Sequence, residues 1–290
     1  MPARTIRLAA VGLLAAWSTL ALSTWALAAA PEPTDPWPDL VRDVFDGRPM
    51  ADGTGLIAIE MPTRAEDAAI VPVTLRLNLP PGDARSVKAV TLVIDQNPAP
   101  VAARFDIDPT VTMISTRVRV DSYTNVHAVA ELSDGTLHVT KTFVKASGGC
   151  SAPAAKNADE AQRSLGRMRL RQFSAERDAA SGLREAQIMV RHPNNSGLQM
   201  DQVTRLYTPA FFVRDIRVWQ GDQLVLRMDG GISMSEDPNI RFSYRPNGAA
   251  TLRAEAIDTD GHRFTGEWPV EETRAHDEGH RAQDAGLVKQ

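Results

Sequence analysis

The sequence predicts an all-β protein made of two immunoglobulin-like antiparallel β-sandwich domains, joined by a flexible linker that carries a cysteine. Three observations predict this class. Short runs rich in Val, Ile, Leu and Thr recur at intervals of about 8–12 residues, with turn residues between them. The runs form two series, separated by a stretch of small and polar residues. Strands do not alternate with long amphipathic helices, as they would in a parallel sheet.

Residues 1–28 have the features of a secretory signal peptide. Arg4 and Arg7 give a short positive region, an apolar segment follows from about Leu8 to Leu22, and Ala26 and Ala28 offer a cleavage site. A retained membrane anchor is the alternative, but Ser and Thr interrupt the segment, which is short for a span of about 20 apolar residues. We expect general secretion, a periplasmic location, and no membrane contact after cleavage.

The first sandwich is expected over residues 40–146. A Pro-rich entry and a short helix-like turn at residues 40–45 come before the strands. Pro, Gly, Asn and Asp separate the apolar runs, which is typical of turns between antiparallel strands. The predicted strands are residues 56–60, 70–79, 89–95, 101–107, 112–122, 125–132 and 137–144.

The second sandwich is expected over residues 165–270. Its turns contain Asn-Gly, Gly-Asp, Gly-Gly and Asp-Gly pairs. The charged tail, residues 271–290, has few apolar residues and is predicted to be disordered. The predicted strands are residues 168–173, 185–191, 211–219, 223–228, 239–244, 251–257 and 263–269.

Residues 147–164 are predicted to be a flexible linker that carries Cys150. Small and polar residues surround the cysteine and offer nothing to bury. Gly148 and Gly149 precede it and free the backbone, so the arm is expected to be mobile and the thiol accessible.

Cys150 is the one cysteine of the sequence, so no internal disulfide can form. In an oxidising compartment three roles are open: a functional thiol, an intermolecular disulfide, or an inert buried residue. Lys145 and Lys156 are the nearby cations, and no histidine lies within ten residues. Because the thiolate is the reactive form, we expect a partner to activate this thiol. Of the three roles, the sequence favours a functional thiol over an intermolecular disulfide or an inert residue, and it does not indicate a self-sufficient catalytic cysteine.

Other chemistries find little support in the sequence. The formal charge of −4 gives no electrostatic reason to expect nucleic acid. His276 and His280 have a helical metal-ligand spacing, but the tail has little reason to be helical, and no Cys/His cluster has zinc spacing. We expect no metal, no cofactor and no catalytic residue. The remaining histidines are His127, His138, His192 and His262.

Several stretches of the chain resemble the SoxY and SoxZ families of bacterial sulfur oxidation. Residues 141–150 (KTFVKASGGC) resemble the carboxyl-terminal arm of SoxY, and residues 94–102 (IDQNPAPVA) and 134–137 (DGTL) are also SoxY-like. The second half resembles SoxZ, most clearly at residues 192–197 (HPNNSG). Further similarity lies at residues 209–212 (PAFF) and 231–242 (GISMSEDPNIRF).

The resemblance implies a fused SoxYZ-like carrier. SoxY attaches sulfur intermediates to its arm cysteine, which corresponds to Cys150, and SoxZ is the immunoglobulin-like partner. The arm here reads Gly-Gly-Cys-Ser-Ala-Pro, without a second Gly-Gly pair, and its cysteine is internal. Fused forms resemble carriers linked with quinoprotein (PQQ-dependent) alcohol dehydrogenase systems, so the cargo need not be thiosulfate.

The implied function is a non-enzymatic periplasmic carrier that presents a sulfur-containing or other thiol-reactive intermediate to partner enzymes. These partners are expected to be periplasmic redox enzymes, either of the sulfur-oxidation type or quinoprotein dehydrogenase and cytochrome c components. The alternative is a non-covalent accessory protein of a quinoprotein dehydrogenase system, in which Cys150 is incidental.

Overall fold

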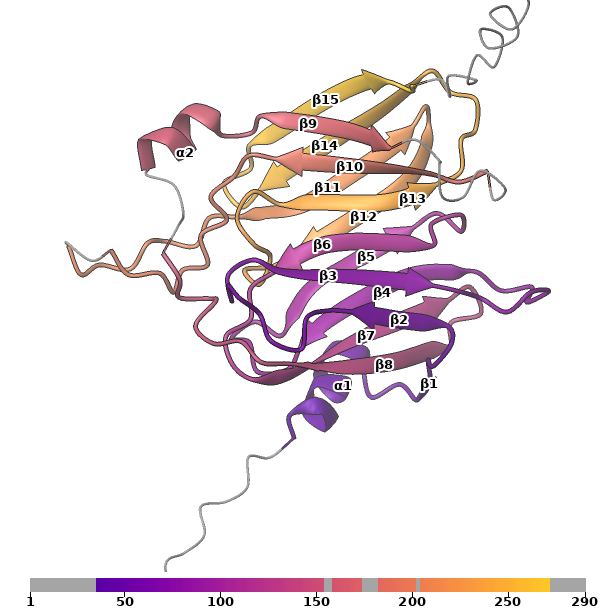
Figure 1. Cartoon of the computed structure of the whole chain (residues 1–290), viewed down its shortest axis with the longest axis horizontal. Helices are drawn as coiled ribbons and strands as arrows, with labels where there is room; N and C mark the ends of the chain where they lie inside the picture. Colours follow the sequence, from indigo (N-terminus) through magenta and orange to yellow (C-terminus); the bar gives the residue numbers. More distant parts are fainter. Residues whose placement is uncertain (1–34, 154–157, 174–181, 202–203, 272–290) are drawn as a thin grey trace, which may run out of the picture. The chain divides into compact units, whose positions relative to one another are not determined.

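The computed structural model describes residues 35–153, 158–173, 182–201 and 204–271 (Figure 1). The predicted signal peptide and all but the first residue of the tail lie outside these residues, so both remain predictions. Neither helix in the described part of the chain is long and apolar enough to cross a membrane.

The described chain consists mainly of β-strands, with two short helices, α1 (Trp37–Phe45) and α2 (Ala158–Ser164). The helix expected near residues 40–45 is confirmed as α1. Strands β2–β15 correspond in order to the predicted segments, whereas the three-residue β1 was not predicted. The strands are β1 (Met50–Asp52), β2 (Ile57–Glu60), β3 (Val71–Leu77), β4 (Val87–Ile94), β5 (Val101–Ile107), β6 (Met113–Val118), β7 (Thr124–Leu132), β8 (Leu137–Val144), β9 (Met168–Phe173), β10 (Arg184–Val190), β11 (Val213–Gln220), β12 (Gln223–Gly230), β13 (Asn239–Tyr244), β14 (Thr251–Asp258) and β15 (Arg263–Pro269).

Two sheets contain all of these strands, and each sheet combines both halves of the sequence. The nine-stranded sheet has the order β1-β8-β7-β4-β5-β12-β11-β14-β15, and the six-stranded sheet has the order β2-β3-β6-β13-β10-β9. Every named pairing is antiparallel except β1 with β8. The all-β class is therefore confirmed.

The halves meet edge to edge in both sheets. Strand β5 of the first half pairs with β12 of the second, with Phe105 opposite Met228. Strand β6 pairs with β13, with Ile114 opposite Phe242. In Figure 1 the earlier strands accordingly continue into the later ones without a break in either sheet. The described residues from Pro36 to Glu271 belong to one compact unit.

A single apolar core lies between the sheets and also crosses the junction. Alternation on β3 buries Val71, Val73, Leu75 and Leu77 and leaves the residues between them more exposed. Side chains from both halves enter the same cluster.

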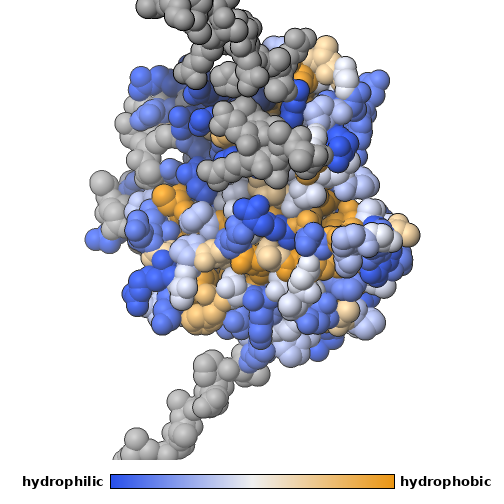
Figure 2. Space-filling model, turned by 45° about the vertical axis from the view of Figure 1, so that its right-hand side comes forward, coloured by the Kyte–Doolittle hydropathy of each residue, from blue (hydrophilic) through white to orange (hydrophobic). Residues whose placement is uncertain are grey.

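Figure 2 shows hydrophobic residues near the middle of one face, interrupted by hydrophilic ones. The exposed large apolar side chains are Ile70, Tyr123, Phe143, Leu206, Tyr207 and Leu224.

Helix α1 forms a smaller apolar cluster on the outer face of the nine-stranded sheet. Phe45 of the helix packs with Val93, Val129 and Leu137. The ring of Trp37 stacks on His127, with 3.6 Å between ring centroids.

Candidate functional site

Cys150 is fully buried, which contradicts the expectation that its thiol protrudes into solvent. The amide of Gly148 donates to the carbonyl of Asp121 (2.8 Å), and the amide of Gly149 donates to the carbonyl of Val120 (3.0 Å). These bonds hold the arm against the chain that follows β6. The predicted linker also includes helix α2. Mobility of the arm remains a prediction.

Gly149 allows the arm to approach the neighbouring backbone closely. A β-carbon at this position would lie 2.1 Å from the carbonyl oxygen of Ala68 and 2.6 Å from that of Val120. Gly148 has a φ of +77°, a conformation that favours glycine. The sequence assigned both glycines to flexibility. In the structure they allow a tight turn and a close approach, which explains how so polar a segment becomes buried.

The second half of the chain closes over the arm. The hydroxyl of Ser196 donates a hydrogen bond to the carbonyl of Cys150. The side-chain amide of Gln199 donates to the carbonyl of Ala152 (3.1 Å), and its oxygen accepts from the amide of Ser196 (3.0 Å). Cys150 therefore lies at the junction of the two halves, in contact with both.

Arg119 is the buried cation of this site, with 1% of its surface exposed. Its Nη1 donates to the carbonyl of Gly149 (3.2 Å) and its Nη2 donates to the carbonyl of Asn194 (3.2 Å), so one guanidinium joins the arm to the second half. Burial lowers the pKa of Arg119, and electrostatic interactions with Cys150, Glu236 and Asp67 act in the opposite direction. Sequence analysis considered only Lys145 and Lys156 as nearby cations. It missed Arg119, which is distant along the chain.

Burial raises the pKa of the Cys150 thiol to about 11, and the carboxylate of Asp121 adds to this rise. The charge of Arg119 lowers the same pKa, but it does not outweigh burial. The carboxylate of Asp121 also accepts a bond from the amide of Cys150 (3.3 Å). The thiol is therefore protonated at neutral pH in this docked state, and a protonated thiol is a poor nucleophile.

Buried polar side chains from both halves fix the position of the segment that holds the arm. The side-chain amide of Asn97 donates to the carbonyl of Arg119 (2.8 Å) and to the hydroxyl of Ser233 (2.9 Å), and its oxygen accepts from the amide of Asp121 (2.9 Å). Asn194 donates to the carbonyl of Ser235 (3.0 Å). The stretches that carry the SoxY and SoxZ resemblance thus converge on the Cys150 site.

The described histidines have structural partners. Nδ1 of His127 lies 2.8 Å from a carboxylate oxygen of Asp95. Buried His192 contacts Asp258 at 3.5 Å, and burial lowers the pKa of His192. His262 lies 2.8 Å from the same carboxylate that His192 contacts, and half-buried His138 lies 3.4 Å from the hydroxyl of Thr136. His276 and His280 lie outside the described residues. Among the residues that the structure describes, no group of three or more His, Cys, Asp or Glu side chains could hold a metal ion.

The fold and the site define an all-β protein that encloses one cysteine where its two halves meet. Residues 41–150 match the model of the family described as sulfur oxidation protein SoxY, and residues 171–269 match that of sulphur oxidation protein SoxZ. The chain is therefore SoxYZ-like: a SoxY domain and a SoxZ domain fused in one polypeptide. The SoxY match ends on Cys150.

Comparison with solved structures finds similarity to part of the chain. The sulfur carrier protein SoxY from Chlorobium limicola f thiosulfatophilum is 27% identical, with a TM-score of 0.33, over 38% of this chain and 94% of that chain. A superoxide reductase (neelaredoxin) from Ignicoccus hospitalis is 14% identical, with a TM-score of 0.28, over 31% and 79%. Among curated proteins, none matches the sequence.

Proposed function

We propose that this protein is a non-enzymatic SoxYZ-like carrier, in which Cys150 binds a sulfur-containing or other thiol-reactive intermediate covalently and presents it to partner enzymes. The observation that carries the proposal is the convergence of SoxY-like and SoxZ-like residues on the sole cysteine. The SoxY match supports it by ending on this residue. The SoxY of Chlorobium limicola, a sulfur carrier protein by its description, supports the same role.

Loading requires the arm to leave its docked position, because the docked thiol is enclosed and protonated. Six hydrogen bonds hold it, from the side chains of Arg119, Ser196 and Gln199 and from the amides of Gly148, Gly149 and Cys150. Each contributes about 0.5–1.5 kcal/mol, so opening would cost several kcal/mol, which partner binding can supply. Joining the Cys150 sulfur to a sulfur of a reduced anion such as thiosulfate would release one proton and two electrons. The partner redox enzyme would accept these electrons.

The partners proposed are periplasmic redox enzymes, either of the sulfur-oxidation type or quinoprotein dehydrogenase and cytochrome c components. The proposed periplasmic location rests on the signal-peptide features of residues 1–28. Sequencing the amino terminus of the protein recovered from the periplasm tests it. We expect the mature chain to begin shortly after Ala28, and recovery of the uncleaved chain in the cytoplasm would contradict the location.

A second candidate is a non-covalent accessory protein of a quinoprotein dehydrogenase system. Complete burial of Cys150, which matches an inert cysteine, is the observation that favours it. Under this alternative, Cys150→Ser would restore full growth to a strain that lacks the gene.

Intact mass measurement on protein purified from its native compartment tests the carrier. We expect a fraction of the parent protein to carry added mass that a reductant removes, and Cys150→Ser to carry none. The carrier proposal fails if the parent mass is unmodified under inducing conditions and Cys150→Ser also restores full growth.

A further inference from the structure

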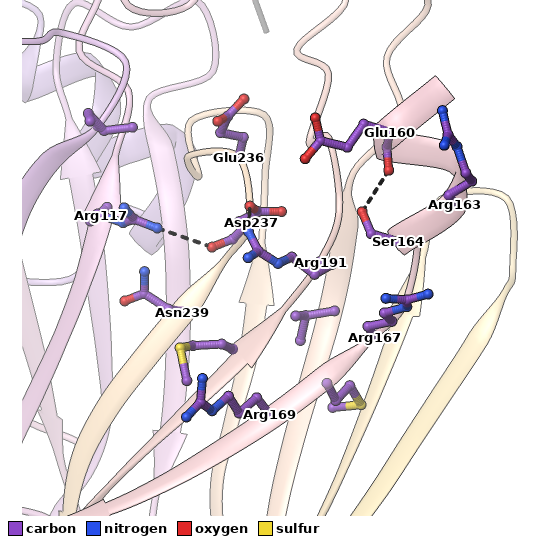
Figure 3. A pocket seen from close by; sticks show the side chains of 14 residues that line it. Arg117, Glu160, Arg163, Ser164, Arg167, Arg169, Arg191, Glu236, Asp237 and Asn239 are labelled. Atoms are coloured by element: carbon purple, nitrogen blue, oxygen red, sulfur yellow. Dashed lines mark hydrogen bonds and ion pairs between the residues drawn. The ribbon is translucent and has the colours of Figure 1, made fainter. Parts of the chain in front are cut away.

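A groove with a cavity volume of about 910 Å³ lies on the outer face of the six-stranded sheet (Figure 3). Met189 of β10 stands directly opposite Asn239 of β13 on one side and Arg169 of β9 on the other. Arg117 of β6 continues this row, since β6 adjoins β13 in the sheet. Helix α2 and the loop before β13 line the groove above this floor.

Positive charge exceeds negative charge in this groove, although the chain as a whole has a formal charge of −4. Arg191 pairs with Asp237, whose carbonyl also accepts from Arg117 (3.3 Å). The five arginines of the lining are Arg117, Arg163, Arg167, Arg169 and Arg191, and the acidic residues are Glu160, Glu236 and Asp237.

Arg167 and Arg169 are the arginines that a ligand could engage most readily. Both side chains belong to exposed residues, and within the described residues neither has an ion-pair partner. Charged side chains also protect sheet edges from pairing, and β9 is an edge strand. Edge protection explains Arg169. It does not explain why arginines from β6, from α2 and from the end of β10 line the same groove.

The extent of the groove indicates the size of its ligand. Neighbouring strands lie about 4.8 Å apart, so the row from β6 to β9 spans roughly 14 Å. A single tetrahedral oxyanion would reach only one or two of these guanidinium groups. An extended acidic segment of four or five residues spans the same length, at about 3.3 Å per residue, and can pair with several arginines.

The groove adjoins the Cys150 site. Arg117 lies two residues before Arg119 on the same segment, and Glu236 is one of the charges that acts on Arg119. Ser235, which precedes Glu236, donates to the carbonyl of Ala69 (2.7 Å), beside the Ala68 carbonyl that Gly149 approaches. A protein segment seated in the groove would therefore lie next to the docked arm.

We propose that this groove binds an acidic segment of a partner protein. The proposal rests on the proposed function in one respect: the partner is taken to be an enzyme that acts on the group carried by Cys150. The groove would hold that enzyme by charge pairing, which steers association and is weakened by salt.

Fluorescence anisotropy of the full-length mature protein with a labelled hexaglutamate peptide tests the groove. We expect binding at low salt that weakens as NaCl is added, and no binding of labelled hexaglutamine. The double variant Arg167→Gln/Arg169→Gln should bind hexaglutamate about tenfold more weakly. The control for charge loss outside the groove is Arg214→Gln on β11 of the other sheet, which removes one exposed arginine that has no ion pair in the described chain. It should bind within twofold of the parent.

Three results would overturn the proposal: no binding of hexaglutamate to the parent, equal binding by the double variant and the parent, or an equal loss in Arg214→Gln. A competition experiment compares sodium sulfate with sodium chloride at equal ionic strength. If sulfate displaces the peptide and chloride does not, the groove is a small-oxyanion site and the proposal is overturned. Circular dichroism checks that each variant is folded. Because Cys150 takes no part in this assay, failure of the groove leaves the mass test of the carrier unaffected, and failure of the carrier leaves peptide binding intact.

Discussion

Gly149 controls how closely the arm can dock. Gly149→Ala would place a methyl group within 2.1 Å of the Ala68 carbonyl oxygen, so the arm must move outward. We expect Cys150 to react with a maleimide at least tenfold faster in this variant, because the thiol is buried only when docked. Gly135→Ala is the control for general destabilisation: its φ of +84° strains an alanine backbone, but no atom lies within 4 Å of the added carbon, so the variant creates no steric clash. Equal labelling rates in Gly149→Ala and the parent would show that the close approach of Gly149 to the Ala68 carbonyl does not control exposure of the thiol.

The thiol of Cys150 should make stability depend on alkaline pH. Its pKa rises to about 11 in the folded protein, from an ordinary value of 9.0, so the folded state keeps its proton longer than the unfolded state. The stabilisation is complete below pH 9 and is lost as pH rises from 9 to 11. Urea unfolding at pH 8 and pH 10 should show an extra loss of about 1.4 kcal/mol in the parent relative to Cys150→Ser. Identical losses would mean that the thiol is not buried in solution.

At the scale of elements, the segment that begins at His192 closes over the arm through Ser196. Ser196→Ala removes the hydroxyl that donates to the Cys150 carbonyl. The loss of about 1 kcal/mol should raise the maleimide labelling rate about fivefold. Ser164→Ala, which removes a bond within α2, should leave the labelling rate unchanged. If Ser196→Ala is labelled at the same rate as the parent, the Ser196 hydrogen bond does not stabilise the docked arm.

Local sequence patterns predicted most of the strands, but they could not predict contacts between residues that are far apart in the sequence. Strand β5 (Val101–Ile107) was predicted with its observed bounds, because turn residues on both sides mark a run of this length. Strand β1 has three residues, too few for any period, and its partner β8 is far along the chain. Arg119 lies within the predicted strand 112–122, although the observed strand β6 ends at Val118. The burial of Arg119 beside Cys150 depends on an arm and a second half that no local pattern describes.

At the scale of the whole molecule, the two halves complete each other's sheets. Each half alone would expose the edges that pair in β5–β12 and β6–β13. We expect chains cut between residues 153 and 158 to remain associated after co-expression, and to elute together in size-exclusion chromatography. A soluble, folded and monomeric first half would contradict this expectation.

Enclosure of Cys150 also has a consequence for its chemical lifetime. Peroxides attack thiolates and drive them through sulfenic acid to sulfinic and sulfonic acids, of which the last cannot be reversed. A chain with one cysteine has no second thiol to rescue an oxidised one. In the docked arm the sulfur is protonated and out of contact with solvent, so its oxidation would be slow. Docking would therefore protect the Cys150 sulfur, which the proposed carrier needs for covalent attachment, while the protein is not bound to a partner.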